Sequence, residues 1–206
     1  MWKKVRRRKN ETLPVSAAYM PASVGFFGAL KLLACGSLES KARVYDLGAG
    51  AAPRLQYTLE DAAGGVSSVA FSADAKLLAS GSLDKTLRVY SRGGGFAPTL
   101  EHTLEIPAEI EDVAFSADSS LLVCASLDSK VRVYDGLDGQ AAPMLKYTLD
   151  DATDWVFSAA FSPDSKFLAS GSNDEKIRLY GLGEGAALPA GDPTLCLLYT
   201  SDAADE

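Results

Sequence analysis

Hydrophobic and polar residues alternate in short segments along the chain, and these segments recur in a fixed order. The segment "VSSVAFS" at 66–72 is followed by "LLASGS" at 77–82, "TLRVY" at 86–90 and "LEHTLE" at 100–105. Each has five to seven residues, with β-branched or aromatic side chains at alternate positions and turn-forming residues at its ends. This pattern predicts four short β-strands. No helical period persists for two turns in the body of the chain.

The four-strand pattern occurs four times. The third strand ends on tyrosine in each copy, at Tyr45, Tyr90, Tyr134 and Tyr180, which gives steps of 45, 44 and 46 residues. Turn segments recur with the strands: "SADA", "SADS" or "SPDS" follows the first strand, and "SLDK", "SLDS" or "SNDE" follows the second. Asp and Ser in such segments can hydrogen-bond their own backbone, so they predict tight turns.

The combined pattern is F-S-x-D, then L-A-S-G-S-x-D, then (I/V/L)-R-(V/L)-Y. It resembles the WD-repeat β-propeller family, whose blades repeat every roughly 40 to 45 residues. The resemblance implies an all-β fold, a β-propeller of four-stranded antiparallel blades. Because closed propellers of this family usually have more blades, we expect an open four-blade arc from a larger propeller. The blades are expected at about 22–60, 66–105, 110–150 and 156–195.

The repeats depart from the family at the positions of a hydrogen-bond network. The closing Trp of the family is Tyr in every copy, and the family's Gly-His pair before the first strand is missing. The acidic residue in the turn between the second and third strands is retained. We expect these acidic side chains to cap their own turns without the histidine, so that each blade lacks a mutually supporting network. They are Glu39, Asp84, Asp128 and Asp174.

Both ends of the chain depart from the repeat. Residues 1–11 form a basic N-terminal arm, and residues 12–195 hold the four repeats. The segment "CLLYTSDAADE" at 196–206 begins where the middle of a fourth strand is expected, and it resembles a translated sequencing adapter. We therefore expect residues 196–206 to be an artefactual tail.

Composition narrows the class of protein. The chain has 206 residues, 47% hydrophobic and 23% charged, which is typical of a globular domain with a sizeable core. Its three Cys form no C-x-x-C pair, which favours an intracellular setting, cytoplasmic or nuclear. No apolar run approaches the roughly 18 residues that a membrane span needs. Residues 10–195 hold 14 basic and 24 acidic residues, a net charge of −10 that does not suit a phosphate backbone.

The sequence contains no recognisable catalytic group. His102, the only histidine, occupies the fourth-strand position of Tyr57 and Tyr147, so we expect a structural role. Cys35 and Cys124 share a position with serines, which favours a small side chain in a packed interior. No nucleophile–base pair or set of metal ligands can be assembled around these residues. We predict that the chain is not an enzyme and has no catalytic residue, metal site or cofactor.

The resemblance implies where partners bind. In the family, the junctions before each first strand and the turns after each second strand form one face around a central channel. The second residue of each first strand points toward that channel, as does the residue before each turn acid. Three exposed leucines and two aromatic side chains would make this face an apolar interaction surface. The partner-binding candidates are Leu38, Ser67, Leu83, Glu111, Leu127, Trp155, Phe157 and Asn173. The alternative is that these side chains pack on their own loops and on adjacent blades.

The predicted function is therefore a protein–protein interaction scaffold that presents the propeller rim to partner proteins or peptides. An alternative is association with nucleic acid or an anionic surface through the N-terminal arm, since a short basic arm can bind phosphates without a fold. The residues of that arm are Lys3, Lys4, Arg6, Arg7, Arg8 and Lys9. A third hypothesis is a purely structural repeat protein without a dedicated partner.

Overall fold

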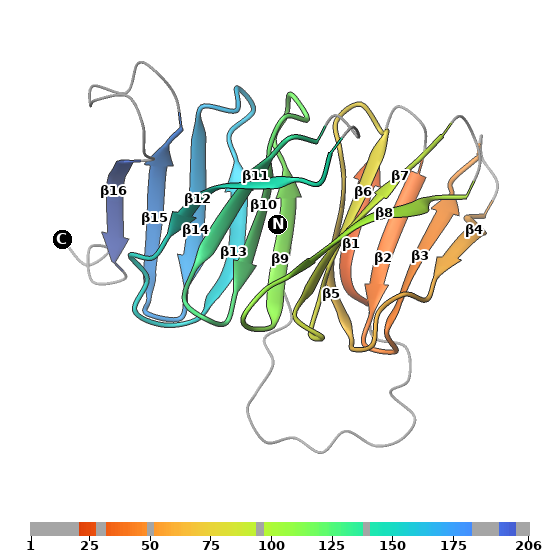
Figure 1. Ribbon diagram of the computed structural model, residues 1–206, viewed down its shortest axis with the longest axis horizontal. Helices are drawn as coiled ribbons and strands as arrows, with labels where there is room; N and C mark the ends of the chain where they lie inside the picture. Colours follow the sequence, from red (N-terminus) through yellow and green to blue (C-terminus); the bar gives the residue numbers. More distant parts are fainter. Residues whose placement is uncertain are drawn as a thin grey trace.

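The computed structural model describes residues 21–27, 32–48, 52–93, 97–137, 141–182 and 194–200. These residues form four antiparallel sheets, and the four strands of each sheet are neighbours in chain order (Figure 1). The prediction of an all-β fold of four-stranded antiparallel blades is confirmed, and the blades form an open arc. Within the described segments there is no helix. We call the sheets blades 1 to 4, and the strands of each blade a, b, c and d in chain order.

The strands are short and similar in length. Blade 1 comprises β1 (Pro21–Phe27), β2 (Leu32–Ser37), β3 (Lys41–Asp46) and β4 (Arg54–Leu59). Blade 2 comprises β5 (Val66–Phe71), β6 (Leu77–Ser82), β7 (Thr86–Ser91) and β8 (Thr99–Glu105). Blade 3 comprises β9 (Ile110–Phe115), β10 (Leu122–Ser126), β11 (Val131–Asp135) and β12 (Met144–Leu149). Blade 4 comprises β13 (Val156–Phe161), β14 (Phe167–Ser172), β15 (Lys176–Gly181) and β16 (Thr194–Thr200).

The tetrapeptide turns share one backbone conformation. In the a–b turn of blade 2, the Ser72 hydroxyl donates to Asp74 Oδ1 at 2.7 Å and accepts the N–H of Leu77 at 2.9 Å. These are the local bonds that Ser and Asp supply in turns. The last residue of every a–b and b–c turn in the described segments adopts a positive φ between 58° and 68°. These residues are Ser40, Ala75, Lys85, Ser119, Ser129, Ser165 and Glu175.

The hydrophobic core lies between the blades and not within them. Three clusters of buried residues occur, one at each blade-to-blade contact. Between blades 2 and 3, Leu87 and Val89 of strand c pack against Leu122, Cys124 and Tyr134 of the next blade. Blades 2 and 3 therefore bury one face against the blade before and the other against the blade after, whereas blades 1 and 4 each have one such contact.

Hydrogen bonds between the first strands (a) of neighbouring blades reinforce the same contacts. The Ser68 hydroxyl of blade 2 donates to Asp112 Oδ1 of blade 3 at 2.9 Å. The other oxygen of that carboxylate, Oδ2, accepts the N–H of Ala159 in blade 4 at 3.2 Å. One carboxylate thus links three consecutive blades.

Strand β16 crosses the point where the sequence repeat fails. Its backbone pairs with β15 from Gly181↔Thr194 to Lys176↔Thr200. The strand d of blade 4 therefore includes residues that we expect to belong to the artefactual tail.

Replacing Leu87 by alanine should reveal how much the fold depends on the contacts between blades. Leu87 is 0% exposed between blades 2 and 3, so Leu87→Ala should lower the free energy of unfolding by about 2–5 kcal/mol. Leu55→Ala, at a position 53% exposed on strand d, is the matched control and should change it by about 0.5 kcal/mol or less. Urea denaturation measures both. Equal losses would show that the inter-blade layer is not the core.

Candidate functional site

Each junction between strand d and the next strand a is tied to a b–c turn. In blade 2 the N–H of Leu83 donates to the carbonyl of Gly65 at 2.8 Å. In blade 4 the N–H of Asn173 donates to the carbonyl of Trp155, also at 2.8 Å. These segments form one face of the arc, along the lower edge of Figure 1. We call it the junction face; it comprises residues 38–40, 60–65, 67, 83–85, 105–109, 111, 127–129, 150–155, 157 and 173–175.

The turn aspartates form two-pronged ion pairs with an arginine four residues later. In blade 2, Arg88 donates to Asp84 Oδ1 at 3.2 Å and to Oδ2 at 2.8 Å. Asp84 also accepts the N–H of Thr86 in its own turn at 3.1 Å and that of Ala63 in the d–a junction at 2.8 Å. The carboxylate thus holds the turn, the junction and strand c together.

The same pairing recurs in the other blades. Arg132 donates to Asp128, and Arg178 to Asp174, with distances of 3.1 and 2.6 Å in both pairs. Asp174 also accepts the N–H of Thr153 from its d–a junction at 3.0 Å. In blade 1, Arg43 donates to a carboxylate oxygen of the longer Glu39 at 3.3 Å.

These ion pairs lower the pKa of the aspartates. Partial burial acts to raise the pKa of Asp84, but the hydrogen bonds from Arg88 and Ala63 outweigh it and hold this pKa at about 2. The Arg178 guanidinium is the main cause of the lowered pKa of Asp174. Both carboxylates are therefore charged at neutral pH, which favours the charge-assisted geometry.

The closing tyrosines lie near polar residues in two blades. Burial, more than any other cause, raises the pKa of Tyr90 to about 12, and Ser80 and Asp61 also influence this pKa. In blade 4, Ser170 and Asp151 likewise influence the pKa of Tyr180, which burial raises. The turn acids Asp84, Asp128 and Asp174 each accept a backbone N–H from the residue two positions later. Arginine replaces the histidine partner of the turn acid, and in these two blades an aspartate stands in the d–a junction before strand a.

Blade 3 has apolar residues at the equivalent positions. Ile106 stands at the position of Asp61, and Cys124 at that of Ser80; both are buried against Tyr134. Burial raises the pKa of the Cys124 thiol to about 12, so the sulfur remains a protonated packing group.

The structure shows Ser67, Glu111 and Phe157 near the starts of β5, β9 and β13, all half-buried. The Ser67 hydroxyl lies between two carbonyls that can accept its hydrogen, Gly81 at 3.0 Å and Ile110 of the next blade. Ser67 therefore links two blades within the arc. Phe157 lies edge-to-face against Trp155, with ring centroids 6.2 Å apart and an interplanar angle of 82°.

The expectation of three exposed leucines is wrong for two of them. Leu38 is 41% exposed on the b–c turn of blade 1, whereas Leu83 and Leu127 are half-buried. The corresponding residue of blade 4 is Asn173, which is exposed. Its side-chain amide donates to Asp154 Oδ2 at 2.6 Å, and the N–H of Trp155 donates to Oδ1 at 2.8 Å. The Trp155–Phe157 pair is thus held in place by its own turn.

The junction face is acidic. It contains thirteen Asp and Glu residues and one basic residue, Lys85. Four of these acids are the turn residues paired with arginine, and Glu60 pairs with Lys41 at 2.6 Å. The remaining carboxylates give this face a negative potential that repels phosphate groups and attracts cationic ones.

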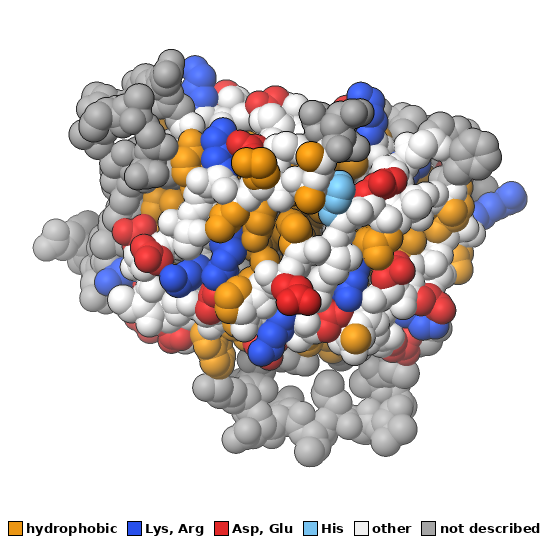
Figure 2. Space-filling model, viewed as in Figure 1, with side chains coloured by type: hydrophobic (Ala, Val, Ile, Leu, Met, Phe, Trp, Pro, Cys, Tyr) orange, Lys and Arg blue, Asp and Glu red, His pale blue; other side chains and the backbone are white. Residues whose placement is uncertain are grey.

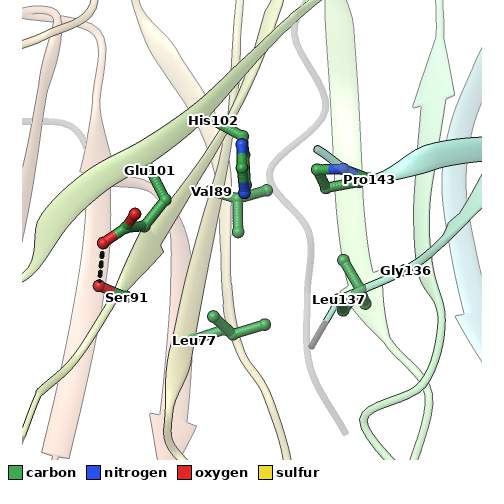
Figure 3. A pocket seen from close by; sticks show the side chains of 8 residues that line it. All are labelled: Leu77, Val89, Ser91, Glu101, His102, Gly136, Leu137 and Pro143. Carbon is green, nitrogen blue, oxygen red and sulfur yellow. Dashed lines mark hydrogen bonds between the residues drawn. The ribbon is translucent and has the colours of Figure 1, made fainter. Parts of the chain in front are cut away.

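A shallow groove lies on the outer side of the arc, between blades 2 and 3. His102 borders a hollow with hydrophobic side chains around it in Figure 2, and Figure 3 shows His102 facing Pro143 across this groove. It has a volume of about 120 Å³, and Glu101 at its border accepts from the Ser91 hydroxyl at 2.5 Å. Its lining residues are Leu77, Val89, Ser91, Glu101, His102, Gly136, Leu137 and Pro143. The groove can hold one apolar side chain; it was not predicted, because the c–d loop of another blade forms one wall.

His102 pairs with Val89, as Tyr57 pairs with Val44 and Tyr147 with Val133, so it occupies their position in strand d. Cys35 and Cys124 are both free thiols. In the described part of the chain, no group of three His, Cys, Asp or Glu residues is arranged to hold a metal ion. No helix in those segments is long and apolar enough to cross a membrane.

Comparison with known proteins identifies a family and a similar solved structure. A family model described as "WD domain, G-beta repeat" matches residues 53–91, 98–135 and 144–181, each match comprising a strand d and the a, b and c strands that follow it. The crystal structure of Sqt1 from Saccharomyces cerevisiae is similar with a TM-score of 0.69 at 15% sequence identity. The similar region covers 81% of this chain and 46% of the Sqt1 chain, so the chain spans about half the length of that protein. The search of curated proteins found no match.

The arginines are the functional-site residues that the sequence analysis missed. Each copy carries arginine four residues after the turn acid, as in Asp84 and Arg88, so the signal was present in the repeat. In a helix, an acid and an arginine at this spacing would predict an ion pair. Here a left-handed residue at the end of the b–c turn brings strand c back beside the carboxylate.

Removal of one turn carboxylate should destabilise the fold. Asp174→Ala leaves Arg178, whose side chain is 3% exposed, without its ion-pair partner. The free energy of unfolding should fall by about 3–5 kcal/mol. Asp164→Ala, in the exposed a–b turn of the same blade, is the control and should lower it by about 1 kcal/mol or less. Comparable losses in urea denaturation would show that the pair does not hold the blade.

The Asp84 pair should also make stability depend on pH. The pKa of Asp84 falls from about 3.9 in the unfolded chain to about 2 in the folded one. Its contribution should therefore be complete above about pH 5 and be lost as the pH falls toward 2. The unfolding free energies of wild type and Asp84→Asn, compared from pH 7 to pH 2, should differ by a constant amount near neutrality and converge in acid. A difference that stays constant down to pH 2 would contradict this.

Proposed function

Because this chain belongs to the WD-repeat family, we propose that it is a protein–protein interaction scaffold whose junction face captures partner proteins or peptides. Family membership supports an interaction scaffold in general. The choice of face rests on the described side chains. We further propose an intracellular location, from the cysteine usage, and no enzymatic activity of its own.

The observation that carries this proposal is the Trp155–Phe157 pair. One backbone hydrogen bond, from the N–H of Asn173 to the Trp155 carbonyl, and the Asp154 carboxylate fix the segment before β13. The ring centroids of the pair lie 6.2 Å apart in an edge-to-face arrangement. A rigid aromatic pair that is still half-exposed offers apolar area with little loss of conformational entropy on binding. Trp is among the residue types that dominate binding energy in protein interfaces.

Differences among the repeats support the same face. The buried positions between blades keep similar residues from copy to copy, whereas the position of Trp155 holds Gly65 in blade 2 and Glu109 in blade 3. The position of Phe157 holds Ser67 in blade 2 and Glu111 in blade 3, whereas Asn173 replaces a leucine that the other three blades share. Folding alone requires no such variety at the junction face, so we attribute it to recognition of an asymmetric partner.

The charge of the face indicates the partner's chemistry. The junction face holds the aromatic pair, the exposed Leu38 and thirteen acidic residues, of which five are paired with Arg or Lys. We propose a peptide segment that combines apolar or aromatic side chains with Lys or Arg. Electrostatic attraction would speed its association and make it sensitive to salt.

A peptide selection tests this proposal. Peptides selected from a displayed random library on the full chain should be rich in aromatic and basic residues. Trp155→Ala/Phe157→Ala should weaken their binding by about 2 kcal/mol, or roughly thirtyfold in Kd. Met144→Ala, at an exposed position of β12 outside this face, is the control and should bind as wild type. Equal binding by the double variant would refute the junction face as the binding site.

The alternative hypothesis concerns Lys3, Lys4, Arg6, Arg7, Arg8 and Lys9, which lie outside the described residues. Their charge supports binding to nucleic acid or an anionic surface. Salt-dependent binding of the full chain to duplex DNA or anionic vesicles, lost when residues 1–11 are deleted, would support it.

A further inference from the structure

Every blade has two faces that are used differently. The front face of a blade, built from alternate residues of strands b and c, packs on the rear face of the next blade. In blade 2 the front face includes Ala79, Leu87 and Val89, and in blade 3 the rear face includes Leu122 and Tyr134. The same relation joins blade 1 to blade 2 and blade 3 to blade 4.

The front face of blade 4 has no such cover from the described residues. Ile177 is 53% exposed, whereas its equivalents Ala42, Leu87 and Val131 are 2%, 0% and 2% exposed. Phe167, in the same face, is 37% exposed. The face thus retains the apolar residues that the other blades bury.

A glycine at the same face provides a second, independent observation. In blades 1 and 2 a Cβ built on Gly36 or Gly81 would lie 2.7 Å from the Val66 carbonyl oxygen or 2.5 Å from the Ile110 side chain of the next blade. The close approach of the neighbouring blade therefore requires glycine at both positions. Gly171 is the equivalent residue of blade 4, and its Cβ would meet nothing within 4 Å. Blade 4 therefore has the shape for a close neighbour, and none of the described residues occupies that place.

The rear face of blade 1 is its counterpart. Leu33, Cys35 and Tyr45 are all half-buried. Their equivalents in blade 3 (Leu122, Cys124 and Tyr134) are buried under the front of blade 2. The chain thus carries both halves of its repeated blade-to-blade contact, one at each end of the arc.

We propose that the front face of blade 4 binds the rear face of blade 1 in a second copy of this chain, so that two copies associate head to tail. A heterologous contact of this kind closes when the rotation between copies permits a ring. The region similar to Sqt1 covers 46% of that chain, so two arcs match most of a chain of that length. Two such contacts would give a closed ring of eight blades. This inference does not depend on the proposed function of the junction face.

The first test is the mass of the full chain in solution. Light scattering or sedimentation should give twice the chain mass of 21.7 kDa. Ile177→Asp places a charge in the contact and should give a monomer that keeps the circular dichroism spectrum of the wild type. Met144→Asp, also at an exposed position but on β12, is the control and should remain a dimer. A monomeric wild-type chain, or an assembly larger than a dimer, would overturn the proposal.

A mixing experiment distinguishes head-to-tail from face-to-face association. Ile177→Asp disables the front face, and Leu33→Asp disables the rear face. Each variant alone should be a monomer, but their mixture should form a heterodimer through the two intact faces. If Leu33→Asp alone still dimerises, the contact is front to front and the head-to-tail proposal is wrong.

Labelling of Cys35 provides a readout that does not require a variant of the rear face. In the dimer Cys35 should be as inaccessible as Cys124, which is buried between blades 2 and 3. Its reaction with a maleimide at constant pH, followed by peptide mass spectrometry, should slow as the wild-type concentration rises. In Ile177→Asp the rate should be fast and independent of concentration. A wild-type rate that does not change with concentration would refute the proposed contact.

Discussion

A sheet of four short strands has almost no interior of its own, so its apolar side chains are buried only when another sheet covers them. In this chain that cover is the packing of the front of each blade on the rear of the next, and all three core clusters lie at these contacts. The remaining features depend on this layer. It aligns the strands a side by side, brings the Asp112 carboxylate within reach of both neighbouring blades, and forms the walls of the groove at His102.

The ion pairs sit at the border of this layer and connect it to the junction face. Asp84 and Asp174 each bind an arginine of strand c, a backbone N–H of their own turn and one of the d–a junction. Because the carboxylate and the backbone fix the junction, the neighbouring surface side chains can differ from blade to blade without loss of the fold. The Trp155–Phe157 pair is one result, since its support comes from the Asp154 turn and not from its own packing alone.

Much of the architecture could be predicted from the sequence, because it follows from local chemistry. Alternating residues such as those of 66–72 define a strand, and Ser-x-Asp segments such as Ser72 to Asp74 define the turn after it. The candidate site was harder to predict. Leu83 and Leu127 were expected to be exposed like Leu38, yet they are half-buried, since the exposure of a turn residue depends on the segments packed beside it. The arginine partners were missed because a four-residue spacing brings two side chains together in this repeat only after the chain has reversed at the turn.

Local patterns along the chain define the repeat: the strands, the turns, the family resemblance and the acidic character of the body. These properties depend on residues near one another in the chain or on simple sums over it. Which side chains remain accessible depends instead on how the blades pack. Leu87 and Ile177 occupy the same position of the repeat, yet one is fully buried and the other is half-exposed. The physical reason is that a side chain is buried only when a second surface covers it, and the repeat pattern describes only the surface that carries the side chain.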